Sequence, residues 1–338
     1  MPADVDSARR SRALQLRSVQ TIRFGRTNAR VPTISLGTWG HGGPNTSEGV
    51  SVGWSGHDDR LAKEALIAAY RRGITHWDTA DAYGNGHAEQ LIGQVFSEVP
   101  RKEIFLATKF GWVKGPSDHF YDSKFMRSQC ERSLRNLRTD VVDLYYFHHC
   151  DFGPNDRYFD DALAVMRQFQ SEGKTRFIGL SDWDASKIMR FIERVDPDVV
   201  QPYRNLIDDQ YESSGLKKWV DDHDLGVAFF SPLKHGLLLG KYEAPAEFPQ
   251  GDFRGGIPEF RDAAFIARMR TARDEVTRRF ANEREPVVVA LTGALLTGNP
   301  NATVLLGQRN PKQVEAASAA GRALTPDELI WLRSVYEL

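Results

Sequence analysis

Cysteine is scarce in this sequence, which contains only Cys130 and Cys150 among 338 residues. Two cysteines are too few for a disulfide framework, and neither has a C-x-x-C partner or another metal-ligand spacing. The sequence therefore favours a reducing, cytoplasmic setting and predicts no metal site.

Long hydrophobic runs are also missing. No stretch reaches the roughly 18 apolar residues that a membrane-spanning helix needs, and the most apolar late stretch, residues 286–298, is too short. Residues 1–19 contain arginines without the apolar core of a signal peptide, and Asp4 and Asp6 argue against a transit peptide. We interpret residues 1–19 as a disordered or weakly helical tail, and we expect no contact with a membrane.

An excess of charge of either sign is absent as well, because the formal net charge is −1. This balance gives no general electrostatic reason to expect nucleic acid or an anionic membrane as a partner. Hydrophobic residues make up 41% of the chain, which is enough for a large core. Two domains would be the usual guess at this length, but a barrel of alternating strands and helices commonly uses about 250 to over 400 residues as one domain. We therefore expect one domain over residues 20–338.

The sequence has no G-x-G-x-x-G turn after an early strand, the turn with which a doubly wound dinucleotide-binding fold should open. The early glycines Gly40, Gly42 and Gly43 precede residues 44–56, a stretch too long and polar to begin a phosphate-binding helix. We interpret residues 44–56 as a loop on the substrate side of a different fold.

Strand-like apolar runs alternate with helical patterns along the chain. Residues 58–73, 123–138 and 159–174 repeat apolar positions every three or four residues, as amphipathic helices do. Residues 21–34 alternate and turn like a small hairpin that could plug the bottom of a barrel. Alternating strands and helices indicate a parallel sheet, and eight strands indicate a closed (β/α)8 TIM barrel, to which we expect extra helices to be added at the C-terminal end. The predicted strands are 35–38, 74–77, 104–108, 141–147, 177–179, 199–201, 226–230 and 303–306.

Three of these runs are followed by polar side chains of the kinds that assist the reduction of a carbonyl group. Asp78 and Tyr83 follow the second run, while Lys109 and His148 follow the third and fourth. Taken singly, each is more often a cap or a surface charge. In a parallel barrel, however, all strands end at one face, where the active sites of this architecture lie. We therefore expect the four side chains to meet.

The chemistry expected of this set follows from hydride transfer, which builds negative charge on the carbonyl oxygen and requires an acid there. Tyr83 is the candidate acid, and the charge of Lys109 should lower the pKa of the phenol from about 10 towards neutrality. Asp78 would keep Lys109 charged. His148 and His149 should point to opposite faces of their strand, so that only one reaches the site. A hydrolase with two carboxylates would need a pair at the strand ends, and only Asp78 is well placed.

The segment Gly73–Gly84, with its D-T-A-x-x-Y-G pattern, resembles the aldo-keto reductases, and in particular bacterial-type members related to the potassium-channel β-subunit branch. The resemblance implies that Asp78, Tyr83, Lys109 and His148 are catalytic. It further implies reduction of aldehydes or ketones to alcohols, or else a regulatory subunit that binds the cofactor and turns over slowly. Similar segments follow in the family's order at residues 36–39, 177–183, 199–205, 229–242 and 305–317, so the resemblance covers roughly residues 20–320.

The resemblance also implies a nicotinamide cofactor. It places Ser181 and Gln201 near the carboxamide and Phe230 against the nicotinamide ring. Other readings stay open, since Ser181 or Asp182 could cap the following helix and Phe230 could be an ordinary barrel aromatic. The remaining residues assigned to the cofactor are Thr38, Trp39, Asp182, Ser231, Pro232, Leu233, Gly236, Lys241, Gly307, Arg309 and Gln313.

Arg309 lies beside a helix expected to begin near Pro311, and a helix start with an adjacent arginine is a favourable place for a phosphate. NADP(H), with its 2′-phosphate, is therefore favoured over NAD(H). An arginine here could instead stack on adenine without distinguishing the two cofactors, or face solvent.

Two positions depart from the family pattern. The usual Ser-Asn pair is Ser181–Asp182, and an ionised aspartate only accepts hydrogen bonds, so one cofactor contact must be lost or turned round. The usual Glu-Asn pair is Ala316–Ala317, so adenine should be held less specifically. If both hydrogen bonds are absent, cofactor affinity falls by about 1 to 3 kcal/mol.

The substrate pocket is expected to be lined by Trp39, Tyr83, Trp112 and His148. This aromatic wall suits small aldehydes and ketones, and it also suits sugars, whose C–H faces pack on aromatic rings. No cluster of basic residues in the sequence designates a carboxylate or phosphate substrate.

Overall fold

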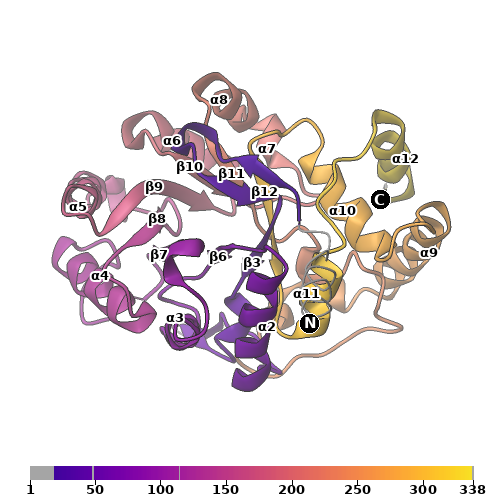
Figure 1. Cartoon of the computed structure of the whole chain (residues 1–338), viewed down its shortest axis with the longest axis horizontal. Helices are drawn as coiled ribbons and strands as arrows, with labels where there is room; N and C mark the ends of the chain where they lie inside the picture. The colour runs from indigo at the N-terminus through magenta and orange to yellow at the C-terminus, as the bar shows by residue number, and fades with distance from the viewer. Residues whose placement is uncertain (1–18, 48, 114, 337–338) are drawn as a thin grey trace, which may run out of the picture.

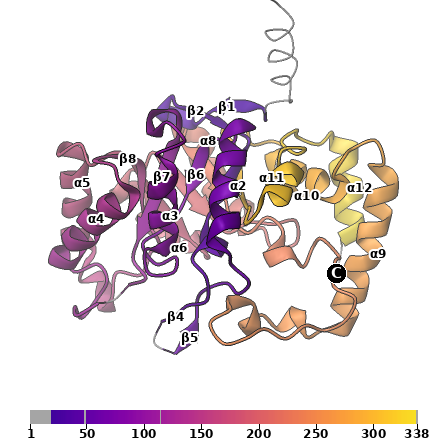
Figure 2. The ribbon, with the colours of Figure 1, turned by 60° about the horizontal axis from the view of Figure 1, so that its bottom comes forward.

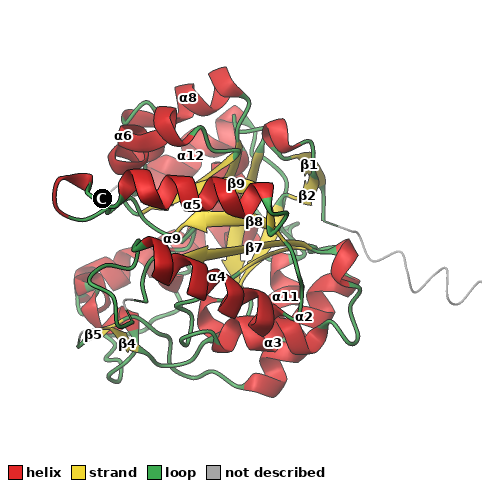
Figure 3. Cartoon of the chain, turned by 90° about the vertical axis from the view of Figure 1, so that its left-hand side faces the viewer, coloured by secondary structure: helices red, strands yellow, loops and turns green. Residues whose placement is uncertain are grey.

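The computed structural model describes residues 19–47, 49–113 and 115–336, so the predicted tail lies outside the described residues except for Val19, which is buried. Eight parallel strands form a closed barrel with helices around it (Figure 1, Figure 3). Neighbours in the barrel follow chain order, and the last strand pairs with the first to close it, which confirms the predicted TIM barrel. The strands are β3 (Ile34–Gly37), β6 (His76–Asp78), β7 (Phe105–Phe110), β8 (Val142–Phe147), β9 (Thr175–Asp182), β10 (Val199–Pro202), β11 (Gly226–Phe229) and β12 (Ala302–Gly307).

The outer helices turn one apolar stripe towards the barrel. In α2 (Asp59–Arg71), the Asp58 side chain caps the helix by accepting from the amide of Leu61, and Ala62, Ala65, Leu66 and Ala69 form the buried stripe. The other helices are α3 (His87–Val95), α4 (Ser123–Leu137), α5 (Phe159–Ser171), α6 (Ala185–Val195), α7 (Gln210–Ser213), α8 (Leu216–His223), α10 (Pro286–Leu296) and α11 (Pro311–Ala317).

Two further helices, α9 (Ala263–Arg279) and α12 (Pro326–Tyr336), extend the barrel at one side together with α10 (Figure 1). They share a second apolar cluster that includes Phe265, Leu291 and Leu332. The extra C-terminal helices predicted from the sequence are thus present. Among the described residues, none of the helices combines the length and apolarity needed to cross a membrane.

A hairpin of β1 (Thr21–Arg23) and β2 (Arg30–Pro32) closes the bottom of the barrel. It lies at the opposite end from the short ribbon of β4 (Thr46–Ser47) and β5 (Val50–Ser51) (Figure 2). Phe24, at the hairpin turn, is fully buried and packs edge-on against Phe105 at a centroid distance of 5.7 Å. The predicted plug is therefore present, and Phe24 is the side chain that fills the barrel floor.

We expect Phe24→Ala to destabilise the protein by about 3 to 5 kcal/mol, because it leaves a cavity in the barrel floor that the closed strands cannot fill by collapsing. Urea denaturation measures this difference. Gln20→Ala, an exposed change just before the hairpin, should stay within about 0.5 kcal/mol of the parent. A Phe24→Ala loss as small as that of Gln20→Ala would show that the hairpin is not part of the cooperative core.

Candidate active site

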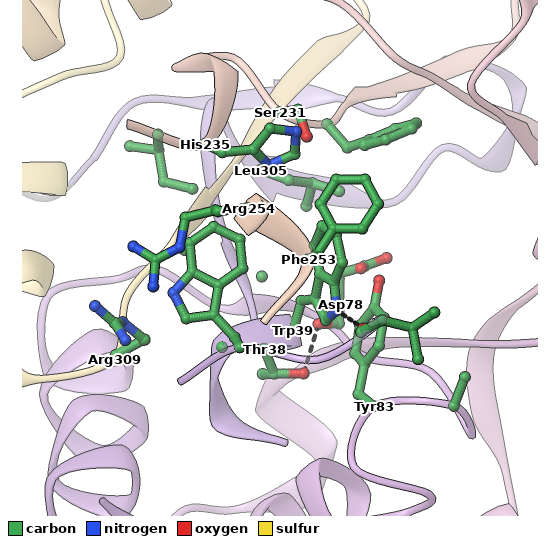
Figure 4. A pocket seen from close by; sticks show the side chains of 18 of the residues that line it. Thr38, Trp39, Asp78, Tyr83, Ser231, His235, Phe253, Arg254, Leu305 and Arg309 are labelled. Atoms are coloured by element: carbon green, nitrogen blue, oxygen red, sulfur yellow. Dashed lines mark hydrogen bonds between the residues drawn. The ribbon is translucent and has the colours of Figure 1, made fainter. Parts of the chain in front are cut away.

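A cavity of about 400 Å³ opens at the carboxyl ends of the barrel strands. Asp78 is the last residue of β6, Lys109 lies near the end of β7, and His148 directly follows β8. Tyr83 lies in the turn after β6, and Figure 4 shows it with Asp78 at one end of the pocket. The fold thus brings together the four side chains that the sequence singles out.

Lys109 is the centre of this group, with only 1% of its side chain exposed. Its ammonium donates to Asp78 Oδ1 at 2.5 Å, to the carbonyl oxygen of Thr79 at 2.8 Å and to the Tyr83 hydroxyl at 3.1 Å. The other oxygen of Asp78 accepts from Gln201 Nε2 at 2.9 Å. Every donor of the ammonium and both carboxylate oxygens therefore have partners.

The electrostatics of the pair follow from this burial. Burial works to lower the pKa of Lys109, but the adjacent Asp78 and Tyr83 hold that pKa above its ordinary value. Burial raises the pKa of Asp78, while Lys109 and Gln201 oppose the rise. Because the ammonium has three acceptors within hydrogen-bonding distance, we treat Asp78 and Lys109 as an ion pair at neutral pH.

The pKa of the Tyr83 phenol differs from the one expected from the sequence. Burial raises its pKa, and the nearby charge of Lys109 offsets only part of that rise. The sequence prediction of a pKa lowered towards neutrality overlooked the desolvation that burial imposes on a phenolate. The consequence is that Tyr83 carries its proton at neutral pH.

His148 faces Tyr83 edge-on, with ring centroids 5.7 Å apart. Its Nδ1 is buried without a hydrogen-bond partner, and burial together with Lys109 lowers its pKa well below the ordinary value, so the ring is neutral. His149 lies outside the pocket, where its ring bonds to the carbonyl oxygen of Gly111. Only one of the two histidines reaches the cavity.

Aromatic rings form the wall beside these groups. Trp39 stacks on Tyr83 at 6.2 Å, and its indole N–H donates to the carbonyl oxygen of Val52, which ties it to the 44–56 loop. Trp112 lies at the rim, 38% exposed and 6.1 Å from the His148 ring. The proposed substrate residues therefore share one wall of the cavity.

Most residues assigned to the cofactor also line this cavity. Thr38 is held at the end of β3 by a bond from its hydroxyl to the carbonyl oxygen of Asp78 at 3.0 Å. Phe230, directly after β11, is only partly buried and meets Trp183 edge-on at 4.9 Å. The remaining members at the cavity are Trp39, Ser181, Gln201, Ser231, Pro232, Leu233, Gly236, Lys241, Gly307, Arg309 and Gln313.

The turn from Ser231 to Gly236 has an unusual backbone. Ser231, Lys234 and His235 all have positive φ, between 44° and 57°, which costs non-glycine residues free energy. Lys234 secures the turn by ion pairs to Asp208 at 2.8 Å and to Glu259 at 3.1 Å. The turn is therefore held in a fixed shape at the pocket wall.

Arg309 is partly buried, so the reading of a solvent-facing arginine is wrong. Its Nη1 donates to the carbonyl oxygen of Ser55 at 2.9 Å, and a Cβ at Gly40 would lie only 2.5 Å from its Cδ. Helix α11 begins at Pro311, as predicted, and Asn310 caps it by accepting from the amide of Gln313.

Asp182 does not line the cavity. Its two carboxylate oxygens accept from the amides of Cys150 at 2.7 Å and Asp184 at 2.9 Å, so this acceptor-only side chain joins the end of β9 to the loop after His148. The helix after β9 is capped by Asp184, and the alternative that Ser181 or Asp182 caps it is wrong.

Several pocket residues had no assignment from the sequence. Trp54, Trp183, His235, Phe253 and Arg254 all line the cavity, mostly from irregular loops that give no periodic signal. Trp54 lies in the 44–56 loop, which the sequence identifies only as a loop on the substrate side.

The sequence shows no basic cluster, yet the fold gathers one. Lys241, Arg254 and Arg309 all line the cavity, and Figure 4 shows the guanidinium groups of Arg254 and Arg309 near each other, at the end away from Tyr83. Burial lowers the pKa of Lys241 and Arg309, and repulsion from Arg254 lowers both further. An anionic group would be attracted to this end of the pocket.

Comparison with known proteins gives the same family from sequence and from structure. The model of the family described as "Aldo/keto reductase family" matches residues 33–337. The aldo-keto reductase yakc of Schizosaccharomyces pombe, whose name specifies NADP(+), is 29% identical over 293 residues, covering 83% of this chain and 81% of its own. A probable voltage-gated potassium channel subunit beta of Arabidopsis thaliana is 27% identical over 313 residues, covering 88% of this chain and 89% of its own. The glycerol dehydrogenase structure from Gluconobacter oxydans superposes with a TM-score of 0.76 at 27% identity, covering 93% of this chain and 94% of that chain.

The buried Asp78–Lys109 ion pair leads to a prediction about the free energy of unfolding. Lys109→Met and Asp78→Asn should each destabilise the protein by about 3 to 5 kcal/mol, because each leaves a buried group without its partner. The double variant should lose clearly less than the sum of the two, since neither charge then remains. Denaturant unfolding of the parent and the three variants measures the coupling.

The control is Glu64→Ala, which removes the exposed Arg60–Glu64 pair on α2 and should cost about 0.3 to 0.5 kcal/mol. Strictly additive losses at Asp78 and Lys109 would contradict the ion pair.

Proposed function

The chain belongs to the aldo/keto reductase family, and from that membership we propose that it is an NADP(H)-dependent oxidoreductase that reduces aldehydes and ketones to alcohols. The observation that carries the proposal is the contact of the Tyr83 hydroxyl with a buried, charged Lys109 beside a neutral His148. That arrangement offers a proton, a positive charge and a hydrogen-bonding imidazole at one point of an otherwise aromatic cavity.

The residues present suit a nicotinamide dinucleotide. Phe230 offers a partly exposed ring at the cavity wall, and Ser181 and Gln201 offer hydrogen-bonding groups near it. Lys241, Arg254 and Arg309 would hold the phosphates, and Arg309 favours the 2′-phosphate of NADP(H). NAD(H) is the alternative if Arg309 only stacks on the adenine.

The cofactor, when bound, supplies the hydride. Tyr83 would give its proton to the substrate oxygen, where negative charge would build during reduction. The charge of Lys109, 3.1 Å from the hydroxyl, stabilises the phenolate that remains on Tyr83. Asp78 keeps Lys109 protonated throughout, and His148 orients the carbonyl by hydrogen bonding.

The cavity wall favours small, uncharged carbonyl compounds. Trp39, Trp54 and Trp112 offer apolar faces, which suit aromatic aldehydes, diketones and the C–H faces of sugars or keto-sugars. Asn45 and Asn85 line the same cavity and can bind hydroxyl groups. The positive charges lie at the other end, where the cofactor phosphates are proposed to bind.

A second function is a nicotinamide-binding regulatory or redox-sensing subunit with slow turnover. The similarity to the Arabidopsis protein, over 88% of this chain, favours keeping it as the alternative. The two functions differ in turnover, because a regulator would hold the cofactor tightly and reduce substrates slowly.

The proposed acid is tested by Tyr83→Phe, which removes the hydroxyl and keeps the ring. We expect kcat for NADPH oxidation with aromatic aldehydes, diketones and aldoses to fall about 100- to 10,000-fold, with NADPH binding unchanged by fluorescence. Tyr70→Phe, whose hydroxyl bonds to Glu103 on the outer surface, should keep parental turnover.

Unchanged turnover in Tyr83→Phe would exclude Tyr83 as the acid. Tight NADPH binding by the parent without turnover of any of these carbonyls would instead favour the regulatory subunit.

The pH profile tests the protonation states. Burial keeps the pKa of Tyr83 above its ordinary 10.0 and that of His148 well below its ordinary 6.5. Neither group therefore changes protonation between about pH 6 and 9, so neither Tyr83 nor His148 should give kcat/KM for reduction an inflection in that range. A fall below an inflection near 6.5 that disappears in His148→Gln would show that His148 titrates, contrary to its buried position.

A further inference from the structure

Three potential metal ligands gather outside the pocket lining and outside the residues assigned to catalysis. The ligand atoms of His57, Asp59 and His87 all lie within 4.8 Å of one another. His87 Nε2 is 2.8 Å from Asp59 Oδ1, and the two imidazole rings meet edge-on with centroids 6.3 Å apart. His57 and Asp59 are neighbours in the sequence, but His87 comes 28 residues after Asp59, and the cluster contains no cysteine. The spacing rules that predicted no metal site therefore did not cover it.

Two glycines pack close to the chain segments that carry these histidines. His57 follows the 44–56 loop, and a Cβ on Gly43 would lie 2.9 Å from its imidazole ring, so the loop packs closely against it. Gly86 precedes His87 with a φ of 93°, and a Cβ there would lie 2.6 Å from Asn136 Nδ2. Both glycines have positive φ, 77° at Gly43 and 93° at Gly86, a backbone conformation that favours glycine.

We propose that His57, Asp59 and His87 form a binding site for a divalent cation of the zinc class. Two imidazoles and one carboxylate are a donor set that Zn²⁺ accepts while keeping a position open for water. Imidazole disfavours Mg²⁺ and Ca²⁺, which prefer oxygen ligands. Bonds of about 2.0 to 2.2 Å to one tetrahedral ion place ligand atoms a little over 3 Å apart, so small side-chain rotations close the site.

Nearby charges both repel and attract a cation at this site. The starts of α2 and α3 carry partial positive charge, and Arg309 bonds to the carbonyl oxygen of Ser55 nearby. Asp59 and the capping Asp58 add two carboxylates at the same place and offset that charge. A simple His87–Asp59 ion pair would use only two of the three side chains and would give His57 no role.

The position of the site links it to the pocket. Trp54 lies three residues before His57, and Tyr83 lies four residues before His87. A bound ion would therefore tie the 44–56 loop to the turn that carries Tyr83. The binding site itself does not depend on the proposed reductase function, because its ligands are separate from the catalytic set.

Titration of the untagged, full-length protein with Co²⁺ tests the site, since cobalt bound by nitrogen and oxygen ligands in a low-symmetry site absorbs visible light. We expect saturable d–d absorption at one ion per chain and a Tm that rises with Co²⁺ concentration. Zn²⁺ should displace the cobalt and remove the absorption.

Variants identify the ligands. His57→Ala and His87→Ala should abolish the visible absorption, and Asp59→Asn should weaken cobalt binding by about tenfold or more. His223→Ala, which removes an exposed histidine of α8, should bind cobalt like the parent. Absence of saturable absorption in the parent, retention of it in either histidine variant, or an unchanged Kd in Asp59→Asn would overturn the proposal.

Discussion

The buried ammonium of Lys109 is the constraint around which the site is arranged. A charge with 1% exposure is tolerated only if acceptors stand within hydrogen-bonding distance, because an unpaired buried ion costs several kcal/mol. The three acceptors come from β6 and the turn that follows it. The pairing of Asp78 with Ala107 brings Lys109, two residues further along β7, to the same face. A slip of one residue would turn Lys109 to the other face, so strand register sets the chemistry.

Some features of the pocket lower the stability of the fold, and packing elsewhere in the protein offsets this loss. The buried ion pair contributes little net stability compared with apolar packing. The positive φ values of Ser231, Lys234 and His235 add strain of about 1 to 3 kcal/mol each. The favourable contributions lie in the barrel core, the plug around Phe24 and the cluster beneath α9, α10 and α12. Part of the cost therefore lies at the pocket, and the gains lie in regular structure.

The sequence predicts the regular part of the molecule well. Runs of apolar residues indicate all eight barrel strands, and the strand ends indicate where Asp78, Lys109 and His148 meet. The sequence does not show whether burial or the charge of Lys109 has the larger effect on the pKa of Tyr83, because desolvation depends on atoms from several elements. It also misplaced Asp182, since a residue type that matches a family position does not reveal which backbone amides will reach it.

There is a physical reason why the sequence does not predict the irregular part of the pocket. The loops around Trp54 and Phe253 have no period, and they are joined by long-range contacts. Asp252 accepts from the Ser55 amide and pairs with Arg254 at 2.6 Å, which holds the pKa of its carboxyl at about 2.

These contacts hold Arg254 close to Lys241 and Arg309, cations that are far apart in the sequence. Asp252 neutralises one of the three charges, so this end of the pocket carries a net positive charge. A bound anion would relieve the mutual repulsion of these cations, so part of the free energy of binding a phosphate group would come from that relief.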